Sequence, residues 1–482
     1  MHEWTQLAPC FRYTQLEMRL ALRLFLVVLT LAFAQNCREA EAVSESPFDK
    51  EAQANFVEYL KIDTSNPPGN ETMGARFLLD ILVREGIEAK LVGPDKDRQS
   101  VWARLPSGTK APALLLMHHI DVVPAPAKDW SVPPFSGEKV NGYFWGRGAL
   151  DIKSLGIAHL MAVVDLKRRA VPLDRDVIFL AVADEEMGGR AGLAALMEKS
   201  PELFSGVGFV LNEGGANVTV VDRIDYWGIE VDQKVPLWIR LTAKGEGGHS
   251  ASPPADGGAT KKLVDAAHAV SAIPMRSELH PSVEAFFKSM ASTKPGKRGR
   301  ILADPGRYFG TPDIAELPYG LQMLLRDTLA MTRLEAGTST NAVPDIATAD
   351  FDIRMIPGSD PAALLTQIKQ VAGTLVEVEV LLSGPPAPAS AVDTDLFASL
   401  SRVLTKAAPS SKVGAMVTAG TTDSRYFRRR GIVAYGFSPF KINYYDGATV
   451  HGADERIRVR FFLEGVELMR QIVSDFCVRK PA

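Results

Sequence analysis

Apolar and polar residues follow two alternating periods along the chain, one typical of helices and one typical of strands. The run ALLLMHHIDVV at 113–123 is almost wholly apolar before His118, as expected of a strand buried on both faces of a sheet. The predicted helices cover residues 48–62, 71–87, about 154–168 and 191–200. The predicted strands lie at 88–93, 100–106, 113–123, 175–183 and 206–213. Strands and helices in alternation predict an α/β domain with a mixed sheet flanked by helices.

The pattern changes after about Val231. Strands with one apolar and one polar face are predicted at 235–245, 346–356 and 375–384, with helices at 259–273 and 360–373 between them. This β-α-β-α-β order predicts a smaller two-layer α+β domain that is open on one sheet face. Residues 276–333 interrupt it with mixed helical and loop sequence, and SGPPAPASAVD is a predicted linker. The chain then returns to an α/β pattern, so we predict a first domain at 48–230 and 387–482 with a second inserted at 231–386.

The N-terminus has the pattern of a secretory signal peptide. Arginines precede an apolar run from Leu24 to Phe33, and AFA precedes Gln35. This predicts a leader over residues 1–34, with Met18 as an alternative start, and a secreted or periplasmic protein. The apolar run is shorter than the roughly 20 residues of a spanning helix, so no stable membrane span is expected after cleavage. An uncleaved membrane anchor is the alternative.

The composition is that of a soluble globular protein. The chain has 482 residues and a formal net charge of −3, which allows two or more domains and gives no electrostatic reason to expect nucleic acid as a partner. Of the three cysteines, Cys37 and Cys477 could pair in an oxidising compartment, but they form no metal-binding pattern.

Acidic residues and histidines stand where several predicted strands end. The carboxyl ends of strands in an open α/β sheet face the crevice where ligands bind. Several carboxylates gathered there would repel one another unless cations neutralised them. Imidazole and carboxylate without cysteine suit zinc, with manganese or cobalt as alternatives. The residues concerned are His119, Asp121, Asp151, Glu185, Glu186, Glu213 and His451.

Each of these residues alone also has an ordinary structural explanation. His119 could be a core histidine, and Asp151 could cap the helix that follows it. Glu213 could be a turn residue before two glycines, and His451 could lie on a surface loop. His118, directly before His119, is a competing metal ligand. It is the whole set that favours a metal centre.

Seven motifs, in order along the chain, resemble those of the zinc-dependent exopeptidase and aminoacylase family. This family includes carboxypeptidases G and S, acetylornithine deacetylase and succinyl-diaminopimelate desuccinylase. The resemblance runs from about Phe48 onward and is closest to the carboxypeptidase S-like branch, because the insert at 276–333 is long. It implies a di-zinc catalytic domain with an inserted lid that often forms a homodimer. The motifs are HHIDVVP, GRGALDIKS, DEEMGG, GGHSASPP, TSTNAVPDIATADFDIR, GTTDSRYF and HGADERI.

The resemblance also implies roles for the residues at the strand ends. His119 and Glu213 would hold one zinc ion, Glu186 and His451 the other, and Asp151 would bridge both. Asp121 lies two residues after His119, on the same face of the strand, and would orient its imidazole. Glu185 would be the general base toward a metal-bound water.

Further residues are implied to bind the substrate. His249 would donate to the oxyanion, often in the active site of the partner subunit. Arg354 would bind the substrate carboxylate. Asn341, Gly420 and Thr421 are weaker candidates for substrate contacts.

Together these observations predict a metallohydrolase that cleaves an amide bond next to a free carboxylate, in N-acyl amino acids or short peptides. A cytoplasmic biosynthetic deacylase and a non-catalytic metal-binding homologue are the alternatives. Phe286 and Phe287 in the insert are expected to be core residues, with a pocket for a long acyl chain as the other interpretation.

Overall fold

The computed structural model describes residues 45–220, 222–384 and 386–480. The predicted leader and Cys37 lie outside these residues, whereas Cys477 is buried. The chain divides into two units, Met1–Glu51 and Ala52–Ala482, and the sheets and the side-chain cluster described below lie in the second. None of the helices that the structure describes has both the length and the apolar character of a membrane span.

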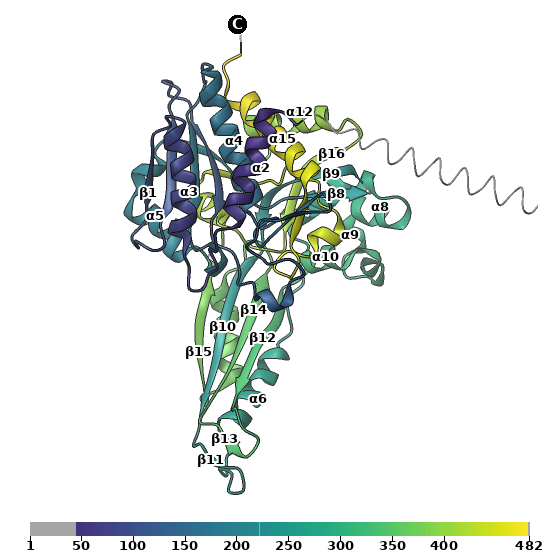
Figure 1. Cartoon of the computed structure of the whole chain (residues 1–482). Coiled ribbons are helices and arrows are strands. Elements are labelled where there is room, and N and C mark those ends of the chain that lie inside the picture. The colour runs from purple at the N-terminus through teal and green to yellow at the C-terminus, as the bar shows by residue number, and fades with distance from the viewer. Residues whose placement is uncertain (1–44, 221, 385, 481–482) are drawn as a thin grey trace, which may run out of the picture. The chain divides into compact units, whose positions relative to one another are not determined.

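Helices and strands alternate through most of the described chain (Figure 1). The helices are α2 (Pro47–Leu60), α3 (Glu71–Arg84), α4 (Lys153–Arg169), α5 (Ala195–Lys199), α6 (Gly258–Ser271), α7 (Pro281–Met290), α8 (Gly296–Ala303), α9 (Pro305–Tyr308), α10 (Tyr319–Gln322), α11 (Pro361–Ala372), α12 (Asp395–Ala407), α13 (Ser424–Arg428), α14 (Tyr444–Gly447) and α15 (Val459–Cys477). The first strands are β1 (Ala89–Val92), β2 (Ser100–Leu105), β3 (Ala113–His119), β4 (Lys139–Val140), β5 (Tyr143–Trp145), β6 (Val177–Val182), β7 (Val207–Asn212), β8 (Ala216–Val220) and β9 (Arg223–Gln233). They are followed by β10 (Val235–Lys244), β11 (Gly248–His249), β12 (Thr328–Ala336), β13 (Ala342–Val343), β14 (Ile346–Met355), β15 (Val376–Ser383), β16 (Lys412–Thr418), β17 (Val433–Gly436) and β18 (Arg456–Arg458).

A nine-stranded mixed sheet forms the larger layer, in the order β1-β2-β6-β3-β7-β17-β9-β16, with β8 paired to β9. Its central strands β6, β3, β7 and β17 are parallel, so their carboxyl ends meet at one edge. Every residue of β3 is buried, which confirms the prediction for its apolar run. Helix α4 packs on β3 and α15, while α5 and α13 contribute to a core that includes Leu115 and Ile178. The predicted mixed sheet with flanking helices is confirmed.

The smaller sheet is antiparallel, with the order β12-β14-β10-β15. Helices α6 and α11 cover one face through a core that includes Leu263, Ile353 and Ile368, and β14 alternates buried and half-exposed residues as its sequence predicts. The outer strand β12 was not predicted, and the stretch 328–333 was wrongly taken as helix and loop. Seven of its nine residues are exposed, and a bulge between Met331 and Arg333 breaks the two-residue alternation of apolar positions that would reveal the strand in the sequence.

Helix α7, in the long insert, packs against β16 at the edge of the nine-stranded sheet. Phe286 is 2% exposed and Phe287 is fully buried, and both belong to a core that includes Tyr226 and Val417. These two phenylalanines are therefore core residues, as expected.

Replacing Phe287 by Ala should lower the free energy of unfolding by about 3–5 kcal/mol, because it removes a fully buried ring and leaves a cavity. Chemical denaturation measures the loss, and Phe287→Leu, which keeps most of the volume, should cost far less. An unchanged denaturation midpoint for Phe287→Ala would show that this ring does not contribute to the core.

Candidate metal centre

The predicted ligands meet because they follow neighbouring parallel strands. His119 ends β3, Glu185 and Glu186 follow β6, and Glu213 follows β7. Since β6, β3 and β7 lie side by side and run in the same direction, their ends fall at one edge of the sheet. Asp151 precedes α4 and His451 follows α14, so both are brought to this edge by tertiary packing.

One carboxylate lies between two histidines. Asp151 Oδ1 is 3.1 Å from His119 Nε2, and its Oδ2 is 3.0 Å from His451 Nε2. Each histidine has a further carboxylate of its own. Glu213 Oε2 is 3.6 Å from His119 Nε2, and Glu186 Oε2 is 3.4 Å from His451 Nε2. The result is two histidine–carboxylate pairs that share Asp151.

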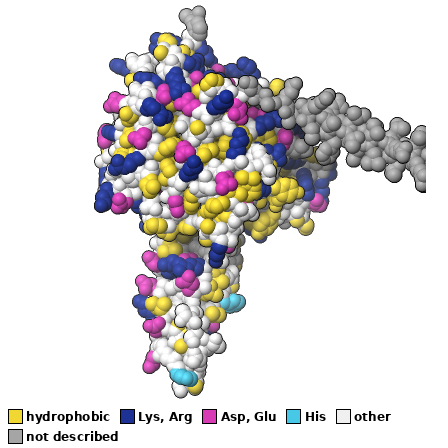
Figure 2. Space-filling view, in the orientation of Figure 1, with side chains coloured by type: hydrophobic (Ala, Val, Ile, Leu, Met, Phe, Trp, Pro, Cys, Tyr) yellow, Lys and Arg dark blue, Asp and Glu magenta, His cyan; other side chains and the backbone are white. Residues whose placement is uncertain are grey.

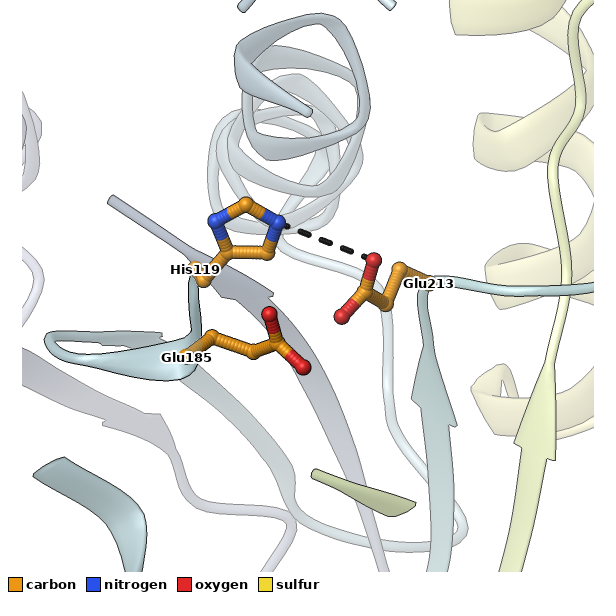
Figure 3. Close-up of side chains that lie close together, drawn as sticks. All are labelled: His119, Glu185 and Glu213. Carbon is orange, nitrogen blue, oxygen red and sulfur yellow. Dashed lines mark ion pairs between the residues drawn. The ribbon is translucent and has the colours of Figure 1, made fainter. Parts of the chain in front are cut away.

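Glu185 lies in the same cluster. Its carboxylate, the imidazole of His119 and the carboxylate of Glu213 each offer an oxygen or nitrogen within 4.8 Å of the others. Figure 3 shows both carboxylates converging beside the His119 ring, with the ion pair to Glu213 drawn. A second such group is formed by His119, Asp151 and Glu186. Both groups could hold a metal ion.

Asp121 supports the cluster in a different way from the one predicted. The Nδ1 of His119 lies 2.7 Å from the backbone carbonyl of Asp121, and 3.7 Å from its carboxylate. The carboxylate instead accepts the backbone N–H groups of Glu185 and Glu186, at 3.1 and 3.0 Å, and the side-chain amide of Asn66 at 2.9 Å. Asp121 therefore shapes the turn that carries the two glutamates.

The carbonyl of Asp121 also decides which nitrogen of His119 bears the proton. A carbonyl oxygen can only accept, so Nδ1 donates to it, and the neutral ring directs the lone pair of Nε2 at Asp151 and Glu213. A lone pair facing two carboxylates is repulsive unless a proton or a metal cation lies between them. This is the arrangement of a histidine that binds a metal.

Burial and mutual repulsion disfavour the charged forms of the acidic groups in the cluster. Burial, followed by the charge of Glu213, raises the pKa of Glu185 well above its usual value. Burial raises the pKa of Glu213 to about 7 and also raises that of Glu186. Hydrogen bonds to Asp151 and Glu186 raise the pKa of His451 to about 10. The cluster thus takes up protons where no cation neutralises it.

Two buried carboxylate oxygens also indicate that the cluster can hold a cation. Oε1 of Glu186 and Oε1 of Glu213 find no hydrogen-bond partner within the described part of the chain. An unpaired buried carboxylate oxygen is costly. Oxygens and imidazole nitrogens without a cysteine form a donor set that divalent zinc, manganese or cobalt can accept.

His118 does not join the cluster. Neighbouring side chains of a strand point to opposite faces, so His118 faces helix α4 rather than the metal-binding edge. Its Nε2 lies 3.3 Å from the hydroxyl of Tyr59, and its ring lies near His159 and Phe179. Burial, with the charges of His159 and His119, lowers its pKa well below the ordinary value. Of the two adjacent histidines, only His119 belongs to the cluster.

Arg354 and Thr421 are brought together from the two sheets. Arg354 lies on β14, and its Nη1 is 3.3 Å from the hydroxyl of Thr421, next to Gly420 in the loop after β16. Nε and Nη2 bind the two carboxylate oxygens of Asp352, at 2.6 and 2.8 Å. One edge of the guanidinium is therefore occupied, and the edge with Nη1 remains to face a ligand.

His249 and Asn341 lie at the other end of the smaller sheet. His249 is on β11, which pairs with β13, and Asn341 directly precedes β13; both are exposed. In the pairing of β10 with β14, Val235 lies opposite Met355 at one end and Lys244 opposite Ile346 at the end near β11 (Figure 1). At about 3.4 Å per residue, the two ends are about 30 Å apart. Within a single chain, His249 and Asn341 therefore lie near the end of the sheet that is far from Arg354.

Several residues around the cluster were not predicted. Arg98 binds Asp184 at 2.7 Å and Glu71 at 2.6 Å, which holds the left-handed turn just before Glu185. Asp423, in the TTDS motif, is fully buried, and its carboxylate approaches Gly189 so closely that a Cβ there would lie 2.3 Å from it. No spacing in the sequence links these residues, because they come from separate loops.

Lys and Arg side chains are interspersed with Asp and Glu on the face shown in Figure 2. This face has no broad region of a single sign, which agrees with the near-neutral charge of the chain.

Comparison with known proteins decides the family. Residues 115–475 match the model of the peptidase family M20/M25/M40. The chain belongs to this family. It is a metal-dependent hydrolase of the metallopeptidase and amidohydrolase class. The resemblance of the sequence motifs to the zinc-dependent exopeptidase and aminoacylase family is confirmed, whereas the carboxypeptidase S-like branch stays a prediction.

Two relatives of known name illustrate the similarity of this member of the M20/M25/M40 family to other proteins. Rat aminoacylase-1A is 31% identical over 428 residues, which is 87% of this chain and 93% of the relative. The N-fatty-acyl-amino acid synthase/hydrolase PM20D1 of Xenopus tropicalis is 30% identical over 373 residues, 74% of this chain and 70% of the relative.

Solved structures agree on the fold. The M20 family metallo-carboxypeptidase Sso-CP2 from Sulfolobus solfataricus has a TM-score of 0.71 at 21% identity, over 88% of this chain and 99% of that one. Human carnosine dipeptidase 1 has a TM-score of 0.68 at 17% identity, over 89% of this chain and 98% of that one.

Proposed function

We propose that this protein hydrolyses the amide bond of N-acyl amino acids, and of short peptides as a second substrate class, next to a free carboxylate. The observation that carries the proposal is the position of Asp151, whose two oxygens each contact one histidine of the cluster. A bridging carboxylate of this kind suits a pair of divalent cations, with zinc first and cobalt or manganese as alternatives.

The residues that would hold the cations divide into two sets. His119 and Glu213 would bind one, Glu186 and His451 the other, and Asp151 both. A related solved structure, the YXEP protein of Bacillus subtilis, is described as a dinuclear metal-binding peptidase of the M20 family, which supports a count of two. When bound, two such cations polarise the scissile carbonyl and lower the pKa of a water molecule.

Glu185 would move the proton. Its carboxylate is buried in the cluster, and burial with the charge of Glu213 raises its pKa, which makes it a stronger base than an ordinary carboxylate. Glu185 would take this proton from the attacking water and deliver it to the nitrogen of the leaving amine. Because Glu186 takes the ligand position beside His451, the two adjacent glutamates have separate tasks.

Arg354 would bind the substrate carboxylate at its Nη1 edge, with Thr421 and Gly420 beside it. The names of the relatives support this substrate class, since aminoacylase and N-fatty-acyl-amino acid hydrolase both refer to N-acyl amino acids. Because these relatives are about 30% identical to this chain, we place N-acyl amino acids first and short peptides second among the proposed substrate classes.

His249 and Asn341 would act in a homodimer that forms through the smaller sheet, the lid. Within one chain they lie at the end of the lid sheet opposite Arg354. Strand β12 is an outer strand of this sheet with most residues exposed, a suitable edge for a second copy. His249 would then donate to the developing oxyanion in the partner's site.

The place of action rests on the N-terminal sequence. The apolar run from Leu24 to Phe33 supports a secreted or periplasmic protein. Mass measurement of the mature N-terminus tests this directly, because a cytoplasmic deacylase would keep residues 1–34.

The metal-loaded protein should hydrolyse N-acyl amino acids and should be about 10- to 100-fold less active on their C-terminal amides, which lack the charge that Arg354 binds. Arg354→Lys should raise KM for the free acids by a similar factor, because the planar fork is lost, and should change the amides little. Steady-state kinetics on matched acids, amides and dipeptides make the comparison. Equal turnover of acid and amide, or no turnover of any of them by metal-loaded protein, would contradict the proposal.

A further inference from the structure

Glu455 joins two of the loops that carry candidate metal ligands. It lies four residues after His451, just before β18, and is fully buried. Its own loop belongs to the C-terminal part of the chain. Its carboxylate, however, reaches the loop at 147–151, more than 300 residues earlier, which ends at Asp151.

The Glu455 carboxylate accepts four hydrogen bonds from that loop. Oε1 accepts the backbone N–H groups of Leu150 at 2.7 Å and Asp151 at 3.0 Å. Oε2 accepts the backbone N–H of Gly148 at 3.2 Å and Nη1 of Arg147 at 2.5 Å.

Arg147 also links its loop to the loop that carries His451. Its Nη2 donates to the carbonyl of Gly452, directly after His451, at 2.9 Å. The carbonyl of Glu455 itself accepts the backbone N–H of Gly146 at 3.0 Å. The Arg147–Glu455 ion pair thus binds both loops at several points, and each side chain of the pair is at most 3% exposed.

We propose that Glu455 is a positioning residue that sets the bridging carboxylate of Asp151 at the correct distance from His451. This inference rests on the proposed di-metal function. The side chains of Asp151 and His451 are 3.0 Å apart. The backbone N–H of Asp151 binds Glu455, and the carbonyl of Gly452, the residue after His451, binds Arg147. If the pair is lost, each loop can move independently and the two ligands no longer meet.

A glutamine of the same shape cannot replace Glu455. A glutamine has one acceptor oxygen, and its amide group is a donor. Wherever the amide is placed, it faces either Arg147 or the backbone N–H groups of Leu150 and Asp151, all of which are donors. The Glu455→Gln variant therefore loses its hydrogen bonds either to Arg147 or to the backbone N–H groups of Leu150 and Asp151, with almost no change in side-chain volume.

Asp176 provides a matched control. Its carboxylate also binds an arginine, Nε of Arg104 at 2.7 Å, and a loop N–H, that of Ser107 at 2.7 Å. It directly precedes β6, whereas the metal-binding glutamates follow the other end of that strand. Six residues of strand separate the two sites, about 20 Å. Asp176→Asn should cost stability and leave the metal centre unchanged.

The experiment measures zinc affinity by competition with a chromophoric chelator, the visible absorption spectrum of the cobalt form, and the melting temperature of the metal-free protein. For Glu455→Gln we expect zinc affinity to fall by about 10- to 100-fold, as is usual when a residue that orients a ligand is replaced, with an altered cobalt spectrum. Asp176→Asn should keep the parent's affinity and spectrum, with a lower melting temperature.

Parent-like affinity and spectrum in Glu455→Gln would overturn the inference while the proposed function stood. Failure of the parent protein to bind any of zinc, cobalt and manganese stoichiometrically would instead overturn the proposed function. Should Glu455→Gln fail to fold, Arg147→Lys, which keeps the charge but cannot bind Glu455 and Gly452 together in the same way, takes its place. Parent-like affinity in that variant would equally overturn the inference.

Discussion

Replacing Glu185 by Gln is expected to lower kcat by about 10³-fold while the protein keeps its full metal content. Glutamine preserves the shape and volume of the side chain but cannot accept a proton. The neighbouring change, Glu186→Gln, should act differently, since Glu186 contacts His451 at 3.4 Å and would lose its place as a ligand. Elemental analysis and steady-state kinetics on the two variants separate a proton-transfer role from a ligand role.

The contrast between the two glutamates is a demanding test, because Glu185 lies within reach of both His119 and Glu213. If Glu185→Gln loses metal as readily as Glu186→Gln, Glu185 is itself a ligand and the general base lies elsewhere. A kcat equal to that of the parent would exclude Glu185 from proton transfer altogether.

Replacing Asp151 by Ala is expected to remove both cations and to lower activity by about 10⁴-fold or more, to the level of the chelator-treated parent. Among the residues that the structure describes, Asp151 is the one carboxylate that contacts both histidines, at 3.1 Å through Oδ1 and 3.0 Å through Oδ2. Its loss leaves His119 and His451 with one carboxylate each and nothing to join the two halves. Metal analysis after dialysis and calorimetric titration with zinc provide the measurement.

Glu213→Gln is the companion variant for Asp151→Ala, because Glu213 pairs with His119, whereas Asp151 contacts both His119 and His451. It should weaken one of the two metal sites and leave the other. Two tightly bound cations in Asp151→Ala would show that this carboxylate does not bridge, and the proposed arrangement of ligands would have to be abandoned.

Strands with a regular apolar pattern are readable in the sequence, both in the interior of a sheet and at its edge. The edge strands β1 and β15 were predicted, whereas the interior strand β9 was not. Strand β3 is buried at every position, so its continuous apolar run identified it. Most residues of strand β12 are exposed and a bulge breaks its alternation, and the edge strand β16 pairs with β9, which lies far away in sequence. Neither strand has a local apolar pattern of sufficient length, so neither was predicted.

The composition of the cluster was predictable, whereas its connections were not. His119, Glu185, Glu186 and Glu213 stand at strand ends, and parallel strands bring their ends to one edge. The choice between His118 and His119 needed the pleat of β3, which turns one ring to Tyr59 and the other to the cluster. Two adjacent histidines are equivalent until the strand is placed in a sheet.

The sequence by itself determined which chemical groups are available and at which strand ends they stand, because apolar periodicity is a local property of the chain and the alternation of strands with helices favours a largely parallel sheet. The tertiary structure alone decided that Asp151 lies between two histidines, that Asp121 holds the turn of Glu185 and that Glu455 joins two loops more than 300 residues apart. These arrangements depend on distances between segments far apart along the chain. Only packing of the whole sheet and its helices fixes such distances.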